Sequence, residues 1–154
     1  MAQTLNLPIG DLVPHDPPMI LIEAMREADL HTCVCTTTIG PDTLFLEPEG
    51  VPALVGVEYM AQTVAAHGGY LAHLANEPVR VGFLLGTPRM VSHVTHFAPG
   101  SRLRIEACAD WGDSELLRFD CKIFDDGDDT LLQEAGLNVF HPRDLDAYLA
   151  QNRG

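Results

Sequence analysis

The stretch Gly56-Val57-Glu58-Tyr59-Met60-Ala61-Gln62-Thr63-Val64-Ala65-Ala66 decides the fold, because it has the pattern of an apolar helix with a carboxylate set into it. At about 100° per residue, Glu58 lies within a broad apolar surface and Gln62 follows one turn later on the same side. A carboxylate in apolar surroundings is costly to ionise, and a carboxylic acid that keeps its proton near neutral pH is suited to general acid catalysis. The alternative is that Glu58 lies at the rim of this surface and points to water. The surface comprises Leu54, Val55, Val57, Met60, Ala61, Val64 and Ala65.

Length and composition predict one globular domain over residues 1–154, with 46% hydrophobic and 20% charged residues. No apolar run approaches the roughly 18 residues of a membrane span, and the N-terminus lacks a basic-then-apolar leader. Four cysteines stand in strand-like segments without C-x-x-C pairs, which favours reduced structural thiols in a cytoplasmic protein. They are Cys33, Cys35, Cys108 and Cys121, and the first two are expected to face the same way on one strand.

The charge balance argues against nucleic acid and against an anionic membrane as partners, because the formal net charge is −13. Four arginines nevertheless fall within 25 residues: Arg80, Arg89, Arg102 and Arg104. Such a basic group on an acidic protein suits an acidic partner or a phosphate. The alternative is four unrelated, solvated side chains.

Periodicity along the chain predicts an α+β protein, an antiparallel sheet wrapped around a long central helix. The helix is expected to begin near Pro52, to weaken at Gly68-Gly69 and to extend its apolar pattern to Leu74. Residues 9–13 suggest a short turn, and residues 14–18 a rigid proline-rich lead-in. Strands are expected at residues 19–25, 31–39, 79–96 with a break near 86–88, 102–111, 116–124 and 131–140. A closing helix is expected at 143–151.

Four motifs, weak alone but ordered and spaced together, give the chain a likeness to a known family. They are Leu12-Val13-Pro14-His15 before an apolar strand, the Gly56 to Gln62 segment of the helix, Gly82-Phe83-Leu84-Leu85-Gly86, and Phe97-Ala98-Pro99-Gly100-Ser101-Arg102-Leu103. The chain resembles hot-dog fold dehydratases that act on 3-hydroxyacyl groups carried by acyl carrier protein. Within that family it is most similar to predicted dehydratases associated with aryl polyene gene clusters.

The resemblance implies removal of water from a 3-hydroxyacyl thioester on a phosphopantetheine arm, which gives a trans-2-enoyl thioester without metal or redox cofactor. Glu58 matches the family's helical acid and Gln62 the glutamine one turn later. Backbone N–H groups near Gly56, at the positive end of the helix, would polarise the thioester carbonyl. Phe83 and Leu84 are expected either to line an acyl tunnel or to belong to the ordinary core, and the arginine group would receive the acidic carrier protein.

The chain departs from the family pattern where the catalytic histidine is expected, in a loop about fourteen residues before the helical acid. Leu44 occupies that position, and residues 40–57 contain no histidine. One hypothesis makes His15 the base, held by flanking prolines, although a histidine there also suits a turn-capping role. His67, about 180° around the helix from Glu58, is predicted to point away.

Two further hypotheses remain open. In one, the chain binds acyl-carrier substrates without catalysing alone and forms a homodimer or heterodimer with a hot-dog subunit that supplies the histidine. In the other, it is an acyl thioesterase, since the same fold supports that chemistry. Histidine spacing in the sequence indicates no metal motif.

Overall fold

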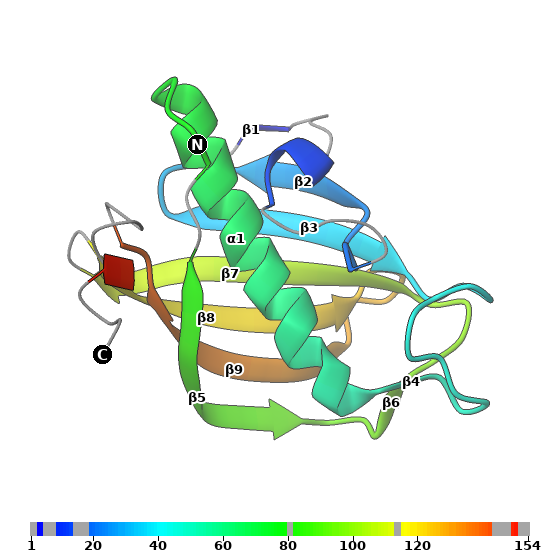
Figure 1. Cartoon of the computed structure of the whole chain (residues 1–154). Helices are drawn as coiled ribbons and strands as arrows, with labels where there is room; N and C mark the ends of the chain where they lie inside the picture. The colour runs from blue at the N-terminus through cyan, green and yellow to red at the C-terminus, as the bar shows by residue number, and fades with distance from the viewer. Residues whose placement is uncertain are drawn as a thin grey trace.

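The computed structural model describes residues 3–4, 9–13, 19–79, 82–112, 115–142 and 149–150. It has a seven-stranded antiparallel sheet with one long helix, α1 (Gly56–Leu74), lying across one face (Figure 1). The expected arrangement of a sheet curved around a central helix is confirmed. In spatial order the strands are β1 (Gln3–Thr4), β2 (Ala24–Ala28), β3 (Thr32–Thr38), β7 (Arg102–Gly112), β8 (Leu116–Asp125), β9 (Leu131–Phe140) and β5 (Phe83–Ser92).

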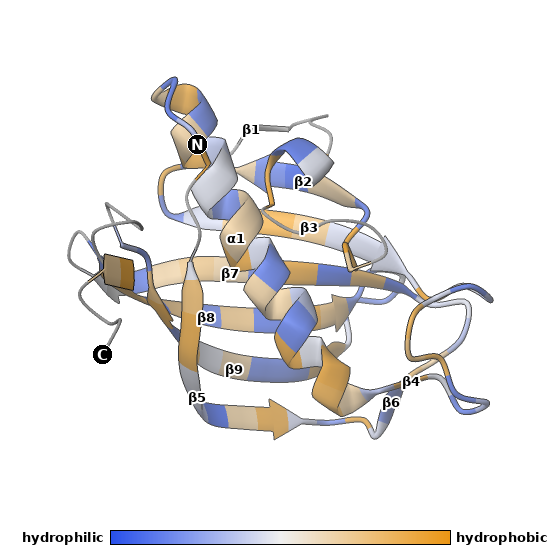
Figure 2. Ribbon diagram, in the orientation of Figure 1, coloured by the Kyte–Doolittle hydropathy of each residue, from blue (hydrophilic) through white to orange (hydrophobic). Residues whose placement is uncertain are grey.

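The core lies between α1 and the inner face of the sheet, and strand alternation builds it. On β7 the side chains of Leu103, Ile105 and Ala107 are buried, and their neighbours in sequence face outward, as the alternating pattern predicts. Figure 2 shows hydrophobic and hydrophilic residues mixed along these strands and along α1. From the helix, Tyr59 packs into this core with its ring 5.9 Å from that of Phe97, and burial raises the pKa of Tyr59 to about 12.

The start of the helix differs from the expectation. Pro52 does not begin α1 but lies in β4 (Val51–Pro52), which pairs with β6 (His96–Phe97) in a second, two-stranded sheet. A 3₁₀ turn, η2 (Ala53–Val55), follows, and α1 begins at Gly56. The pairing of Pro52 with His96 therefore outweighs the preference of proline for a first helical turn. It also leaves Leu54 exposed, outside the apolar surface to which it was assigned.

The first long strand also lies later than expected, at Ala24–Ala28 rather than residues 19–25. The reason is tertiary, because the backbone N–H of Leu21 donates to the side chain of Gln62 instead of to a neighbouring strand. Gly68-Gly69 does not weaken the helix. A Cβ on Gly69 would lie 2.0 Å from the carbonyl oxygen of Leu12, so glycine allows a close approach to the turn after η1 (Ile9–Asp11).

The remaining predictions are largely confirmed. β5 runs through Gly86-Thr87-Pro88 with two register shifts instead of breaking there. Residues 149–150 are helical, and the rest of the closing helix expected at 143–151 lies outside the described residues. All four cysteines are free thiols; Cys33 and Cys35 are buried side by side, with their sulfur atoms 3.9 Å apart. Within the described residues, no helix combines the length and apolarity needed to cross a membrane.

Candidate active site

A cavity of about 570 Å³ lies between α1 and the inner face of β7, β8 and β9, with β5 contributing at one side. Its walls are mostly apolar, and its polar lining comes chiefly from Glu58, His67, Glu77 and His141. The apolar lining comprises Leu30, Ala61, Val64, Ala65, Leu71, Ala72, Ala75, Leu84, Ala109, Leu117, Phe119 and Val139, with Gly68. A space of this size and lining suits an extended apolar ligand.

The cavity exists because one face of α1 carries small residues. Ala61, Ala65, Gly68, Ala72 and Ala75 follow one another at intervals of four, three, four and three residues, and all line the cavity. This spacing places them on one face of an α-helix. Larger side chains at these positions would occupy the space between helix and sheet.

Glu58 lines the cavity from the first turn of α1 and is half-buried. It is thus neither fully enclosed nor directed only to water, but faces a space lined by apolar residues. Gln62 lies one turn later and donates from Nε2 to Glu58 Oε1 at 3.2 Å. The predicted pair of acid and amide on one side of the helix is therefore present, and the amide helps orient the carboxylate.

Gln62 is completely buried, and its side-chain amide bonds to protein groups. Besides Glu58, Nε2 donates to the carbonyl oxygen of Met19 at 2.7 Å, while Oε1 accepts from the backbone N–H of Leu21 at 2.8 Å. Both N–H groups and the carbonyl oxygen are thus in use. Gln62 was expected to bind substrate, but the structure gives it a positioning role: it joins segment 19–21 to the helix that carries Glu58.

Gly56 is buried at the start of α1 and is not among the residues that line the cavity. A Cβ there would lie 1.8 Å from Oε1 of Gln133, so the position accepts only glycine without rearrangement. Its N–H donates to the carbonyl oxygen of Ala53. The expected role of this amide in binding a thioester carbonyl is therefore not supported by the geometry, and Gly56 serves close packing.

Phe83 and Leu84, the two residues after the helix that were candidates for lining an acyl tunnel, differ in their relation to the cavity. Leu84 lines the cavity, whereas Phe83, 36% exposed, does not. Both belong to β5, where successive side chains point to opposite faces.

Two histidines that were not expected in the site line the same cavity, His67 and His141. His67 is 3% exposed, its Nε2 lies 2.8 Å from the carbonyl oxygen of Asp29, and burial lowers its pKa. Because a carbonyl only accepts, Nε2 carries the proton and Nδ1 carries the lone pair. His67 was predicted to point away from Glu58, about 180° around the helix, yet both residues line this cavity.

The distance along the helix still separates these groups. Nine residues at about 1.5 Å rise place His67 roughly 13 Å from Glu58, beyond joint action on two adjacent carbon atoms. His15, the expected base, lies outside the described residues. Within the described residues the histidines that line this cavity are His67 and His141, so no described imidazole lines it close to Glu58 along the helix.

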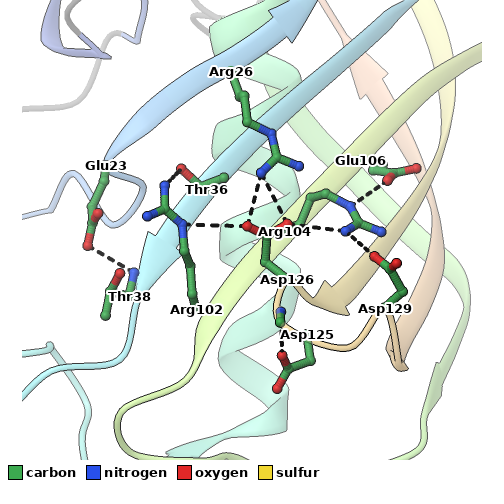
Figure 3. Close-up of polar contacts among 11 residues, drawn as sticks. Glu23, Arg26, Thr36, Thr38, Arg102, Arg104, Glu106, Asp125, Asp126 and Asp129 are labelled. Atoms are coloured by element: carbon green, nitrogen blue, oxygen red, sulfur yellow. Dashed lines mark hydrogen bonds and ion pairs between the residues drawn. The ribbon is translucent and has the colours of Figure 1, made fainter.

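The arginines expected to receive a carrier protein do not form one group. Arg104 is 14% exposed and is enclosed by Glu106, Asp126 and Asp129 on the outer face of the sheet (Figure 3). Burial opposes its charge, but these three carboxylates raise the pKa of Arg104 above its ordinary value. The same Asp126 binds Arg26 at 3.0 Å and lies 3.6 Å from Arg102, and the contact with Arg26 is the main cause that lowers the pKa of Asp126.

Arg89 lies elsewhere, on β5, separated from β7 by β9 and β8. It lines a shallow groove of about 220 Å³ with Arg118 and Lys122, and Asp120 and Glu134 also contribute. Arg80 lies outside the described residues. The structure therefore brings Arg102 and Arg104 together within an ion-pair network and separates Arg89 from both.

Solved structures of other proteins share the fold of this chain. The chain matches the dehydratase heterocomplex ApeI:P from Xenorhabdus doucetiae with a TM-score of 0.86 and 25% identity, over 97% of this chain and 100% of that one. Thioesterase superfamily member 2 of zebrafish matches with a TM-score of 0.62 and 12% identity, over 86% and 89% of the two chains. A hypothetical thioesterase with coenzyme A from Streptococcus pneumoniae TIGR4 matches with a TM-score of 0.59 and 15% identity, over 79% and 84%. The fold is the hot-dog fold.

A family model then gives the assignment. The ApeP-like model, described as ApeP dehydratase, matches residues 7–150, and the chain belongs to this dehydratase family. A search of curated proteins returns no match. The family agrees with the resemblance seen in the sequence, whereas the thioesterase structures share the fold alone at their low identity.

Proposed function

We propose that this protein works in the dehydration of a 3-hydroxyacyl thioester, holding the acyl chain in the cavity beside α1 and supplying Glu58 as the general acid. The observation that carries the proposal is that Glu58 lines a mostly apolar cavity and that its carboxylate accepts a hydrogen bond from the buried Gln62. Membership of the dehydratase family supports the reaction class. The thioester substrate is our inference from the family resemblance of the sequence and from the mostly apolar lining of the cavity.

The reaction needs two groups acting on neighbouring carbon atoms. A base removes the C2 proton, the C3–O bond breaks, and the departing hydroxyl takes a proton and leaves as water. The electron pair of the C2–H bond becomes the second bond between C2 and C3. Glu58 donates the proton to the hydroxyl, since a carboxylic acid facing an apolar cavity is suited to that step.

A partner subunit supplies the base in our proposal. No described histidine lines the cavity near Glu58, and the residue at the usual position is Leu44. The structure that this chain matches with 25% identity is a dehydratase heterocomplex, which supports a second hot-dog subunit as the partner. His15 remains the alternative base within this chain, and a homodimer remains the alternative assembly.

The edge strand β5 is the surface that we propose for this partner. β5 ends the strand order, so no described strand pairs with its outer side. It also exposes large apolar side chains, with Leu84 43% and Leu85 58% exposed. An open strand edge with apolar side chains favours pairing with another chain.

A carrier protein presents the substrate on its phosphopantetheine arm, and we propose the groove with Arg89, Arg118 and Lys122 as its docking surface. Within the described part of the chain, neither Arg89 nor Lys122 forms an ion pair, whereas Arg102 and Arg104 are engaged by carboxylates. Unpaired cations favour encounter with an acidic partner, chiefly through the association rate.

The test is conversion of a 3-hydroxyacyl thioester on holo carrier protein, measured as enoyl product by mass spectrometry, for the chain alone and with its hot-dog partner. We expect conversion only with the partner and its loss in Glu58→Gln. Glu27→Gln, on β2 outside the cavity, is the matched control and should keep activity.

Other results would redirect the assignment. Activity of the chain alone would remove the need for a partner base, and its loss in His15→Ala would then identify that base. Release of free acid in place of enoyl product would indicate a thioesterase. Full activity of Glu58→Gln with the partner present would contradict the proposed acid.

A further inference from the structure

We propose that Glu47, Glu49 and His96 form a binding site for a divalent transition-metal ion, at the junction of β6 and the loop of residues 39–50 that joins β3 to β4. This site is independent of the proposed dehydration and takes no part in it. One nitrogen of His96 and one oxygen of each carboxylate all lie within 4.8 Å of one another. Metal ligands in proteins bind at about 2.0–2.2 Å, so small side-chain rotations bring three such donors onto one ion.

The backbone of the two glutamates is held in place before any ion binds. Residues Glu47 and Gly50 exchange both backbone hydrogen bonds, at 2.9 and 3.0 Å, around a tight turn that carries Glu49. Gly50 has a φ of 124°, and a Cβ there would lie 2.1 Å from the carbonyl oxygen of Phe97. The turn is therefore pressed against β6, the strand that carries the third donor.

His96 is fixed by a second set of contacts. Its backbone pairs with Pro52 in the β4–β6 ladder, and its Nδ1 lies 3.1 Å from Oγ1 of Thr95. Its Nε2 lies 3.2 Å from Oε1 of Glu47. Histidines that bind metal usually hold the other ring nitrogen in such a hydrogen bond, which sets the tautomer and the ring orientation.

The contacts of the His96 ring are compatible with either neutral tautomer. With the proton on Nε2, the ring donates to Glu47 and the hydroxyl of Thr95 donates to Nδ1. With the proton on Nδ1 toward Thr95, the lone pair of Nε2 faces a carboxylate oxygen of Glu47, and a metal ion between the two atoms makes that approach favourable. Within the part of the chain that the structure describes, no lysine or arginine forms an ion pair with Glu47 or Glu49. Two adjacent carboxylates and one neutral imidazole balance the charge of a divalent ion.

The donor set selects the class of ion. An imidazole nitrogen with two carboxylate oxygens suits Zn²⁺ and its first-row neighbours, whereas Ca²⁺ and Mg²⁺ prefer oxygen alone. The remaining coordination positions would hold water, since the glutamates are exposed and the imidazole is partly exposed. A bound ion would fasten the loop of residues 39–50 to β6, close to η2, the turn that precedes α1.

The experiment is a titration of the full-length chain with Zn²⁺, followed by calorimetry, with Ca²⁺ as the comparison ion. Cys108 is an exposed thiol and a competing soft ligand, so all proteins carry Cys108→Ser. We expect one Zn²⁺ per chain, with no comparable binding of Ca²⁺. Loss of a direct ligand in His96→Ala or Glu49→Gln should weaken binding at least about tenfold, since even outer-sphere changes cost 10–100-fold.

His93→Ala is the matched control. His93 also pairs with a glutamate, at 3.6 Å from Glu134, but is not part of the three-donor group. It should leave the Zn²⁺ affinity unchanged, and metal-free circular dichroism should show that all variants are folded. Bound Zn²⁺ should also raise the melting temperature of the unmodified site and not that of His96→Ala.

Three results would overturn the proposal. They are absence of Zn²⁺ binding to the unmodified site, binding of Zn²⁺ that persists in folded His96→Ala, and equal binding of Ca²⁺ and Zn²⁺. The first would leave a hydrogen bond from Nε2–H of His96 to Glu47 as the contact between the two side chains. The other two would reduce the site to a pair of carboxylates or move it elsewhere on the chain.

Discussion

At the scale of single residues, Gln62 shows how one amide connects distant parts of the chain. It is buried, 41 residues from Leu21 in sequence, and its three hydrogen bonds reach the backbone of segment 19–21 and the carboxylate of Glu58. The position of the acid therefore depends on a segment that shares no regular element with it.

Gln62→Leu should lower the free energy of unfolding by about 2–4 kcal/mol, because it removes the three hydrogen bonds of a fully buried amide and leaves the N–H of Leu21 and the carbonyl of Met19 without their side-chain partner. Urea denaturation measures this loss. The same variant should reduce turnover by the complex with the partner, because Glu58 loses its orienting donor. A loss of less than about 1 kcal/mol would contradict the role of Gln62 in joining segment 19–21 to α1.

His67 gives a pH dependence whose sign follows from its burial. Burial lowers the pKa of His67, so the folded protein holds this group neutral. At pH values between the lowered pKa of His67 in the folded protein and its ordinary value of about 6.5, the unfolded chain binds more protons than the folded protein does. The stabilising contribution of neutral His67 is therefore complete above about pH 6.5 and is lost as the pH falls below that value.

His67→Gln keeps a donor for the carbonyl of Asp29 but does not titrate. We expect its free energy of unfolding to fall less steeply than that of the unmodified protein as pH drops from 7.5 to 5, over a range that brackets the ordinary value of about 6.5. His93→Gln, a change at a half-exposed position, is the control. Identical pH slopes for the His67 variant and the unmodified protein would show that His67 is not held neutral.

At the scale of elements, α1 provides both the acid and the floor of the cavity. The small residues that line it occupy positions from Ala61 to Ala75, so the floor extends along the helix away from Glu58. If the acyl chain lies along this floor, a bulky side chain far from Glu58 should exclude only long acyl chains, whereas one close to Glu58 should exclude short chains as well.

Ala72→Phe should reduce kcat/KM about 10–200-fold for a 3-hydroxydecanoyl thioester and little for a 3-hydroxybutyryl thioester, because the phenyl ring fills only the far part of the cavity. Ala65→Phe, closer to Glu58, should affect both. His73→Phe is the control, since His73 is exposed and does not line the cavity. Equal effects of Ala72→Phe on both substrates would show that the chain does not follow the helix.

Element identity was largely predictable, and element boundaries were not. Alternation along residues 102–108 predicted β7, because the pleat of a strand repeats locally every two residues. The beginning of α1 and of β2 depended instead on Pro52 pairing with His96 and on Leu21 bonding to Gln62. Those partners lie more than 40 residues away, so no local pattern contains them.

At the scale of the whole molecule, the open edge of β5 favours assembly. Leu85 is 58% exposed on β5, which pairs with β9 on one side only, whereas β7, β8 and β9 have a neighbouring strand on both sides. The missing loop histidine and this edge lead to the same expectation, that the complete site includes a second chain.

Leu85→Lys should weaken assembly with the partner subunit without unfolding the chain, because a charge replaces an exposed apolar contact. Light scattering after gel filtration measures the assembly, and circular dichroism the fold. Leu74→Lys is the matched control, since Leu74 is 57% exposed but lies at the end of α1. Assembly that survives Leu85→Lys and fails with Leu74→Lys would move the interface to the helix end.

Sequence patterns alone were enough to predict the class of fold and the placement of Glu58 and Gln62 on one side of a helix, and to show that residues 40–57 contain no histidine. These features are local, set by periods of 3.6 and 2 residues. Tertiary contacts were needed to show that His67 shares a cavity with Glu58, that carboxylates enclose Arg104, and that Glu47, Glu49 and His96 converge. The cavity forms where α1 packs on the sheet, the pairing of β7 with β8 brings Asp126 to Arg104, and the pairing of β4 with β6 brings His96 to the two glutamates. No local repeat in the sequence contains these pairings.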